Sequence, residues 1–102
     1  MITTNKKNGE FIITFSEKVG IENAADFKNT IAAAIKDYQK IKIVLLSKVN
    51  IHLSIIQMIL AAEYLCKSKN KKIEISDASN SLNYMFNELG LEPDKLFVTN
   101  KA

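Results

Sequence analysis

Short stretches rich in branched and aromatic residues alternate along this chain with longer stretches of helical period. Residues 10–15 (EFIITF) predict a strand, because β-branched and aromatic side chains favour extended backbone. Residues 2–6 predict a preceding strand. The two would be joined through Lys7-Asn8-Gly9, since Asn-Gly is a strong hairpin signal.

Three later stretches also predict strands. Residues 41–46 are almost continuously aliphatic, which is typical of a central strand covered on both faces. Residues 72–75 place Ile73 and Ile75 on one side of an extended segment. Residues 96–98 predict a last short strand.

Three segments carry apolar residues at helical spacing. Residues 23–38 begin with Asn23 as the expected N-cap, and residues 54–68 and 79–89 predict a second and a third helix. Gly90 follows the third, where a left-handed glycine often ends a helix. The apolar face of the first helix comprises Ala24, Phe27, Ile31, Ala34, Ile35 and Tyr38.

The order strand-strand-helix-strand-helix-strand-helix predicts an α/β fold, because short connections through helices join parallel strands. We expect a mixed or mostly parallel sheet of about four to five strands with three main helices packed on it. The chain has 102 residues and no internal repeat or linker, so residues 1–102 are expected to form a single domain.

Composition narrows the classes of function. The lone Cys66 cannot form an internal disulfide, and one cysteine with one histidine gives no recognisable zinc site. We expect neither a metal nor another cofactor. The chain has no arginine, which argues against specific nucleic-acid recognition despite the formal charge of +3. No apolar run is long enough to cross a bilayer and no signal peptide is visible, so a cytoplasmic protein is expected.

Ser54 stands where the second helix begins. Ser54 and Gln57 form a capping-box pattern, and Leu53 with Met58 could add a hydrophobic staple. A cap serine is also well placed to carry a phosphate. His52 beside Ser54 raises a hydrolase hypothesis, but no neighbouring acid or G-x-S-x-G elbow supports it. The sequence therefore predicts a non-enzymatic protein.

The second helix has more apolar residues than one core stripe needs. At 100° per residue, Ile56, Leu60 and Tyr64 form a row outside the stripe, which indicates either a partner surface or a neighbouring helix. The expected core stripe comprises Ile55, Met58, Ile59, Ala62, Leu65 and Cys66.

Four lysines follow this helix. The favoured interpretation is that these cations complement the dipole at the C-terminus of the helix. The alternative is that they bind acidic lipid head groups or a nucleotide phosphate. The cluster comprises Lys67, Lys69, Lys71 and Lys72.

Four segments together resemble the STAS family, the anti-sigma factor antagonist domains. They are residues 19–24 (VGIENA), 43–49 (IVLLSKV), 54–60 (SIIQMIL) and 82–91 (LNYMFNELGL), and the resemblance runs from about Phe11 to Phe97. It implies a STAS-like domain that switches partners when a serine kinase phosphorylates a hydroxyl at the start of the second helix.

Phosphorylatable members of that family carry an Asp-Ser/Thr-Ser-Gly type loop. When the family's loop is aligned with this chain without a gap after Val49, Leu53 takes the Asp position and Ser54 takes the acceptor position. Aligning Gln57 with the glutamine of one subgroup instead places His52 at the Asp position and Leu53 at the acceptor position. In either register the acid is missing, and Ile55 or Ile56 replaces the glycine.

The resemblance therefore predicts a bacterial-type regulatory domain whose partner is an anti-sigma factor, a serine kinase-like protein or a subunit of a larger complex. The alternatives are a constitutive scaffold in a transport or signalling complex and a domain that binds a small ligand in an apolar pocket. Ser54 is the candidate phospho-acceptor. The expected partner-binding residues are Asn50, His52, Leu53, Ile56, Leu60 and Tyr64.

Overall fold

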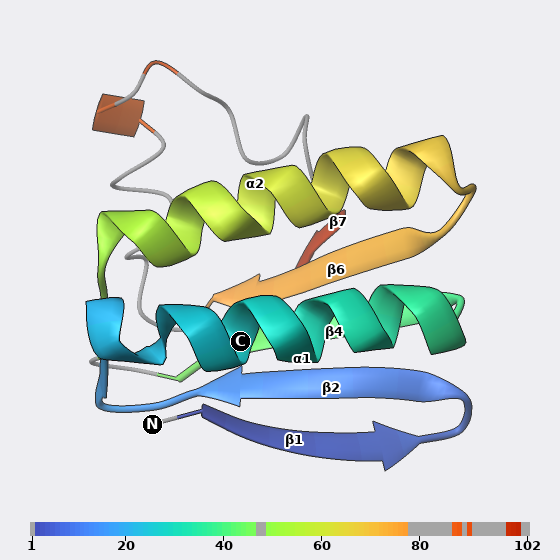
Figure 1. Cartoon of the computed structure of the whole chain (residues 1–102), viewed down its shortest axis with the longest axis horizontal. Helices are drawn as coiled ribbons and strands as arrows, with labels where there is room; N and C mark the ends of the chain where they lie inside the picture. The colour runs from blue at the N-terminus through green and yellow to red at the C-terminus, as the bar shows by residue number, and fades with distance from the viewer. Residues whose placement is uncertain (1, 47–48, 78–86, 89, 91–97, 101–102) are drawn as a thin grey trace.

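The computed structural model describes residues 2–46, 49–77, 87–88, 90 and 98–100. The helices α1 and α2 and the strands follow the expected alternation, and the α/β class is confirmed (Figure 1). The elements are β1 Ile2–Lys7, β2 Glu10–Phe15, β3 Lys18–Val19, the 3-10 helix η1 Ile21–Asn23, α1 Ala24–Asp37, β4 Lys40–Leu45, β5 Asn50–Ile51, α2 Leu53–Ser68, β6 Lys72–Asp77 and β7 Val98–Asn100.

Four strands of six residues make the body of a mixed sheet, and the short β7 lies at its edge. The order is β1-β2-β4-β6-β7, with β1 antiparallel to β2 and the other neighbours parallel. The hairpin between β1 and β2 turns at Asn8 and Gly9, with φ angles of 53° and 78°. Two successive positive φ angles are what a two-residue hairpin loop of type I′ requires, so the expected Asn-Gly turn is present.

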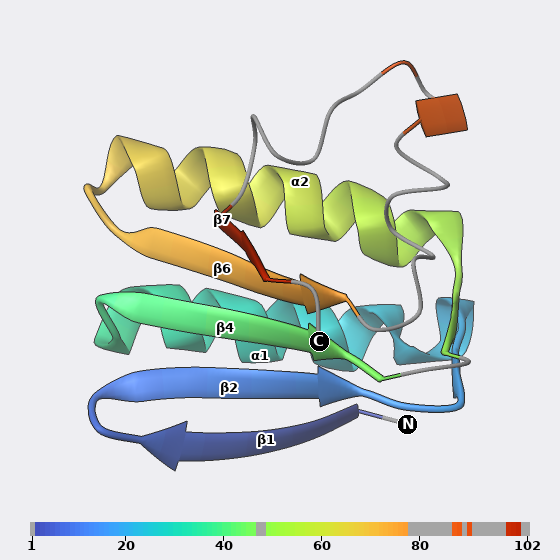
Figure 2. The same ribbon diagram turned by 180° about the vertical axis from the view of Figure 1, so that it is seen from behind.

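Both helices cover the same face of the sheet, as the front and back views show (Figures 1 and 2). Ile13, Ile43 and Ile75 occupy one register row on β2, β4 and β6, and all three are buried beneath the helices. Phe15 meets Phe27 of α1 edge to face, with ring centroids 5.3 Å apart. This single apolar layer forms the core.

On the opposite face of the sheet, the described residues place no helix over β2, β4 and β6 (Figure 2). Side chains of these strands form ion pairs there. Lys40 Nζ lies 3.1 Å from Glu10 and 3.5 Å from Glu74, while Lys42 lies 4.0 Å from Glu74. The two carboxylates raise the pKa of Lys40, the Glu10 hydrogen bond most. The central position of β4 is therefore confirmed, but its expected cover on both faces is wrong for the residues described.

The ends of α1 and of the chain differ from what the sequence predicted or lie outside the described residues. Asn23 does precede α1, but its side chain caps no N–H of that helix; its Oδ1 accepts the N–H of Gly20 at 3.0 Å. Most of the third helix expected over residues 79–89, with residues 96 and 97, lies outside the described residues. Among those described, no helix is both long and apolar enough to cross a lipid bilayer.

Candidate functional site

The first turns of α1 and α2 lie at the same end of the molecule, where the parallel strands β2, β4 and β6 finish (Figure 1). There β3 and β5 pair in parallel to form a second, two-stranded sheet. The His52 N–H donates to the Val19 carbonyl at 2.9 Å, and the Asn50 N–H to the Glu17 carbonyl at 2.7 Å. This pairing brings the segment before α1 against the segment before α2.

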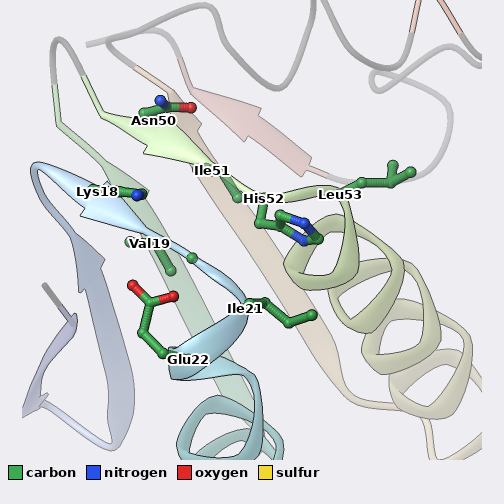
Figure 3. A pocket seen from close by; sticks show the side chains of 9 residues that line it. Lys18, Val19, Ile21, Glu22, Asn50, Ile51, His52 and Leu53 are labelled. Carbon is green, nitrogen blue, oxygen red and sulfur yellow. The ribbon is translucent and has the colours of Figure 1, made fainter.

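A hollow of about 380 Å³ lies between these two segments (Figure 3). Ile21 is 65% exposed and Leu53 41% exposed, so two large apolar side chains border it in contact with solvent. Exposed apolar groups with polar neighbours are typical of surfaces that bind other proteins. The lining residues are Lys18, Val19, Gly20, Ile21, Glu22, Asn50, Ile51, His52 and Leu53.

His52, and not Ser54, caps α2. Its Nδ1 accepts the backbone N–H of Ser54 at 3.1 Å, in the position that an N-cap side chain normally occupies. Ser54 is the second residue of the helix, so the predicted capping box with Gln57 and the staple of Leu53 with Met58 are wrong. A histidine ring reaches that N–H because His52 is extended, with φ −70° and ψ 148°.

The Ser54 hydroxyl meets the same ring nitrogen, with Oγ 2.9 Å from His52 Nδ1. Because Nδ1 accepts from the Ser54 backbone, we infer that it is unprotonated and that the hydroxyl donates to it as well. The hydroxyl thus lies in the first turn of α2, where the helix dipole favours negative charge. This position is chemically suited to carry a phosphate, and equally suited to remain a local cap contact.

Comparisons of sequence find nothing similar: no family model and no curated protein matches the chain. Comparisons of structure do. The phosphorylated form of the Bacillus cell fate determinant SpoIIAA superimposes with a TM-score of 0.79 at 12% identity, covering 100% of this chain and 91% of SpoIIAA. An anti-sigma factor antagonist from Mycobacterium paratuberculosis gives 0.77 at 17% identity, over 97% of this chain and 83% of its own. The protein TM1081 from Thermotoga maritima gives 0.79 at 18% identity, over 99% and 86%.

This chain has the STAS fold. The resemblance to the STAS family is therefore confirmed at the level of the fold.

Within the STAS fold, three of the six expected partner-binding residues come together. Asn50, His52 and Leu53 all line the hollow. The row along α2 does not form a continuous surface: Ile56 is fully buried, Leu60 is partly buried against the core, and Tyr64 is 77% exposed. Ile56 as an exposed contact residue is therefore wrong, because it belongs to this chain's own core.

The sequence analysis missed the other half of the hollow. Lys18, Ile21 and Glu22 reach it because β3 pairs with β5, and both of these strands have only two residues. Strands this short leave no alternation to detect. The one sequence feature that points there is the segment of residues 19–24, which also carries part of the family resemblance.

The lysines after α2 do not act as one cluster. Lys71 Nζ donates to the Ile35 carbonyl and, at 3.3 Å, to the Lys36 carbonyl, so it satisfies the end of α1 and not that of α2. Lys67 pairs with Glu63 at 2.9 Å.

Among the described residues, no group of three or more histidine, cysteine and acidic side chains could hold a metal ion.

Proposed function

We propose that this chain is a cytoplasmic, non-enzymatic interaction domain that works like an anti-sigma factor antagonist in bacterial-type regulation. One observation carries the proposal: the exposed side chains of Ile21 and Leu53 border the same hollow at the start of α2, together with the polar residues Lys18, Asn50 and His52. A protein partner would bury the two apolar side chains and pair with the polar rim.

Ser54 would regulate this contact through phosphorylation by a partner serine kinase. A phosphate on Oγ would add negative charge in the first turn of α2 and would replace the hydroxyl that now meets His52. The structural neighbour SpoIIAA has been described in a phosphorylated and an unphosphorylated form. The partner that senses the change would be an anti-sigma factor or the kinase itself.

A constitutive scaffold in a transport or signalling complex is the second candidate function. Depending on the register, Ile55 or Ile56 stands where switching members have a glycine. Both are fully buried and fix the first turn of α2 in the core. No acidic residue stands at the two positions before Ser54. In this case the hollow would bind its partner without phosphorylation.

Substitutions of Ser54 discriminate between the two functions. We expect Ser54→Asp to weaken binding of the natural partner about tenfold or more if the chain is a switch, since it mimics part of the phosphate charge. Gln57→Glu is the matched control, because it adds the same charge at an exposed position one turn later. The partner is first isolated from native cells with the wild-type chain, and affinities are then measured with purified proteins.

Two further readouts complete this test. If the chain is a switch, mass spectrometry of the protein from native cells should find phosphate on Ser54. If no phosphate is found and Ser54→Asp binds the partner as tightly as the wild-type chain, the chain is a constitutive scaffold. Ile21→Glu should abolish partner binding in either case. If Ile21→Glu binds normally and Tyr64→Glu does not, the partner uses the outer side of α2 and the proposed surface is wrong.

A further inference from the structure

A second hollow separates the outer surfaces of α1 and α2. It measures about 390 Å³ and lies between two helices that run in the same direction from the same end of the molecule (Figure 1). Each helix contributes four residues at the spacing i, i+3, i+4, i+7, which is one face of about two turns. The lining residues are Lys28, Ile31, Ala32 and Ile35 from α1 with Met58, Ala61, Ala62 and Leu65 from α2. We call this set the interhelical groove.

The α2 side of the groove is unusually apolar for a helix surface in contact with water. In this helix of 16 residues the lysine and acidic side chains are Glu63 and Lys67, which pair with each other on the side away from the groove. Leu65 is nevertheless 39% exposed, Ala61 is exposed, and the neighbouring Tyr64 is 77% exposed. A helix that is apolar nearly all round is normally covered on every side.

The α1 side supplies positive charge. Lys28 is the only charged residue among the described residues that line the groove. Lys36 lies just outside the groove, at about 40° from Ala32 around the helix axis on the side opposite Lys28. Asp26 and Asp37 fall on the far side of α1, at about 120° and 140° from Ala32. The groove therefore combines an apolar floor with a basic edge.

We propose that the interhelical groove docks a short amphipathic helix of a partner protein, with leucine-like residues on one face and acidic residues flanking them. The alanines Ala32 and Ala61 leave room for a helix backbone to approach, and its acidic flank would pair with Lys28 and Lys36. A second copy of this chain fits less well, because a two-fold contact would bring the basic edge against itself. This surface is separate from the hollow at the start of α2.

Two designed peptides test the charge requirement directly. Both carry leucines at i, i+3, i+4 and i+7 in a helix of roughly four turns; one has glutamates and the other lysines beside the leucines. We expect the glutamate peptide to bind the full chain at least tenfold more tightly, with an affinity that falls as salt rises. Amide chemical shifts should change at groove residues of both helices.

Neighbouring alanines of α1 provide a matched pair of variants. Ala32→Glu places an acid in the groove and should weaken the glutamate peptide about tenfold or more. Ala33→Glu makes the same change about 100° away, at another exposed position, and should leave binding unchanged. Circular dichroism checks that both variants fold.

Several outcomes overturn the proposal. If the lysine peptide binds as tightly as the glutamate peptide, the proposed preference for an acidic partner is wrong. If Ala32→Glu and Ala33→Glu weaken binding equally, the proposed location of the docking site is wrong. Concentration-dependent dimerisation abolished by Ala32→Glu assigns the groove to a second copy, and sedimentation with anionic vesicles abolished by Ala32→Glu assigns it to a membrane. Ile21→Glu should leave peptide binding unchanged, so the groove and the proposed function can fail independently.

Discussion

His52 holds the start of α2 through one ring nitrogen that serves both the backbone and the hydroxyl of Ser54. The two contacts differ in what they stabilise. The backbone contact satisfies one of the N–H groups that every helix leaves unpaired at its first turn. The hydroxyl contact orients the side chain that the proposed switch would modify.

Substitutions of His52 and Ser54 separate these contacts. We expect His52→Ala to lower the free energy of unfolding by about 1 kcal/mol, because it removes the cap acceptor. Ser54→Ala should change it by less than about 0.5 kcal/mol, because the backbone N–H and its acceptor remain. Urea unfolding followed by circular dichroism measures both. A larger loss in Ser54→Ala than in His52→Ala contradicts the observed cap.

Ile56 was predicted to be exposed although the helical period used to place it is correct. Its angle around the axis of α2 is as expected, but the buried side of the helix is wider than the single narrow stripe that the sequence predicted. On α2 the buried arc runs from Ile55 through Ile59 and Glu63 to Ile56. Leu65 and Met58, which the sequence placed in the stripe, are instead partly exposed beside the interhelical groove.

At the scale of elements, a side chain from a distant part of the sequence donates hydrogen bonds to the last carbonyl groups of α1. Lys71 follows α2 in sequence, yet its ammonium group donates to carbonyls of the last turn of α1. This contact ties the α2–β6 connection to the end of α1. It also explains why a lysine at this position belongs to the fold and is not simply a solvated charge.

Replacing that lysine should loosen the end of α1. We expect Lys71→Met, which keeps the length of the side chain, to lower the free energy of unfolding by about 1 kcal/mol, since charged hydrogen bonds to the last carbonyls are lost. Lys69→Met is the control, because Lys69 is exposed two residues earlier. Hydrogen exchange of amides in the last turn of α1 gives a local readout. Equal effects of the two substitutions would show that the contact contributes nothing.

At the scale of the whole molecule, the buried apolar side chains of the described residues form one cluster, most of which lies between the five-stranded sheet and the two helices that cover it. Cys66 on α2 is fully buried in that cluster. Burial raises the pKa of its thiol above the ordinary value of 9.0, Lys71 opposes the shift and Glu63 adds to it.

Cys66 makes stability depend on pH in the alkaline range. In the unfolded chain the thiol ionises near its ordinary pKa of 9.0, whereas the folded chain retains the proton. The unfolded state then binds fewer protons, so the free energy of unfolding should decrease as the pH rises above that value. Urea titrations at several pH values measure the slope, and Cys66→Ala provides the control. A slope that is the same in Cys66→Ala would contradict this assignment.

Much of the architecture was determined by the sequence alone, because it depends on local preferences. The Asn8-Gly9 turn, the aliphatic run of β4 and the helical period of α1 each follow from the conformations that those residues favour. Their order was enough to predict the α/β class and the resemblance to STAS domains. The missing acid and glycine near Ser54 were visible at the same level.

The tertiary structure decided everything that depends on which segments meet. It placed both helices on one face, so that β4 has ion pairs on its other side. It paired two-residue strands, which brings Ile21 and Leu53 to the border of one hollow. It also assigned the cap of α2 to His52 and the contacts at the end of α1 to Lys71. Contacts between distant segments depend on packing geometry, which periodicity along one chain does not encode. The fold class and the segment of Asn50, His52 and Leu53 were therefore predictable from the sequence, whereas the residues that complete each proposed surface were decided by the tertiary structure.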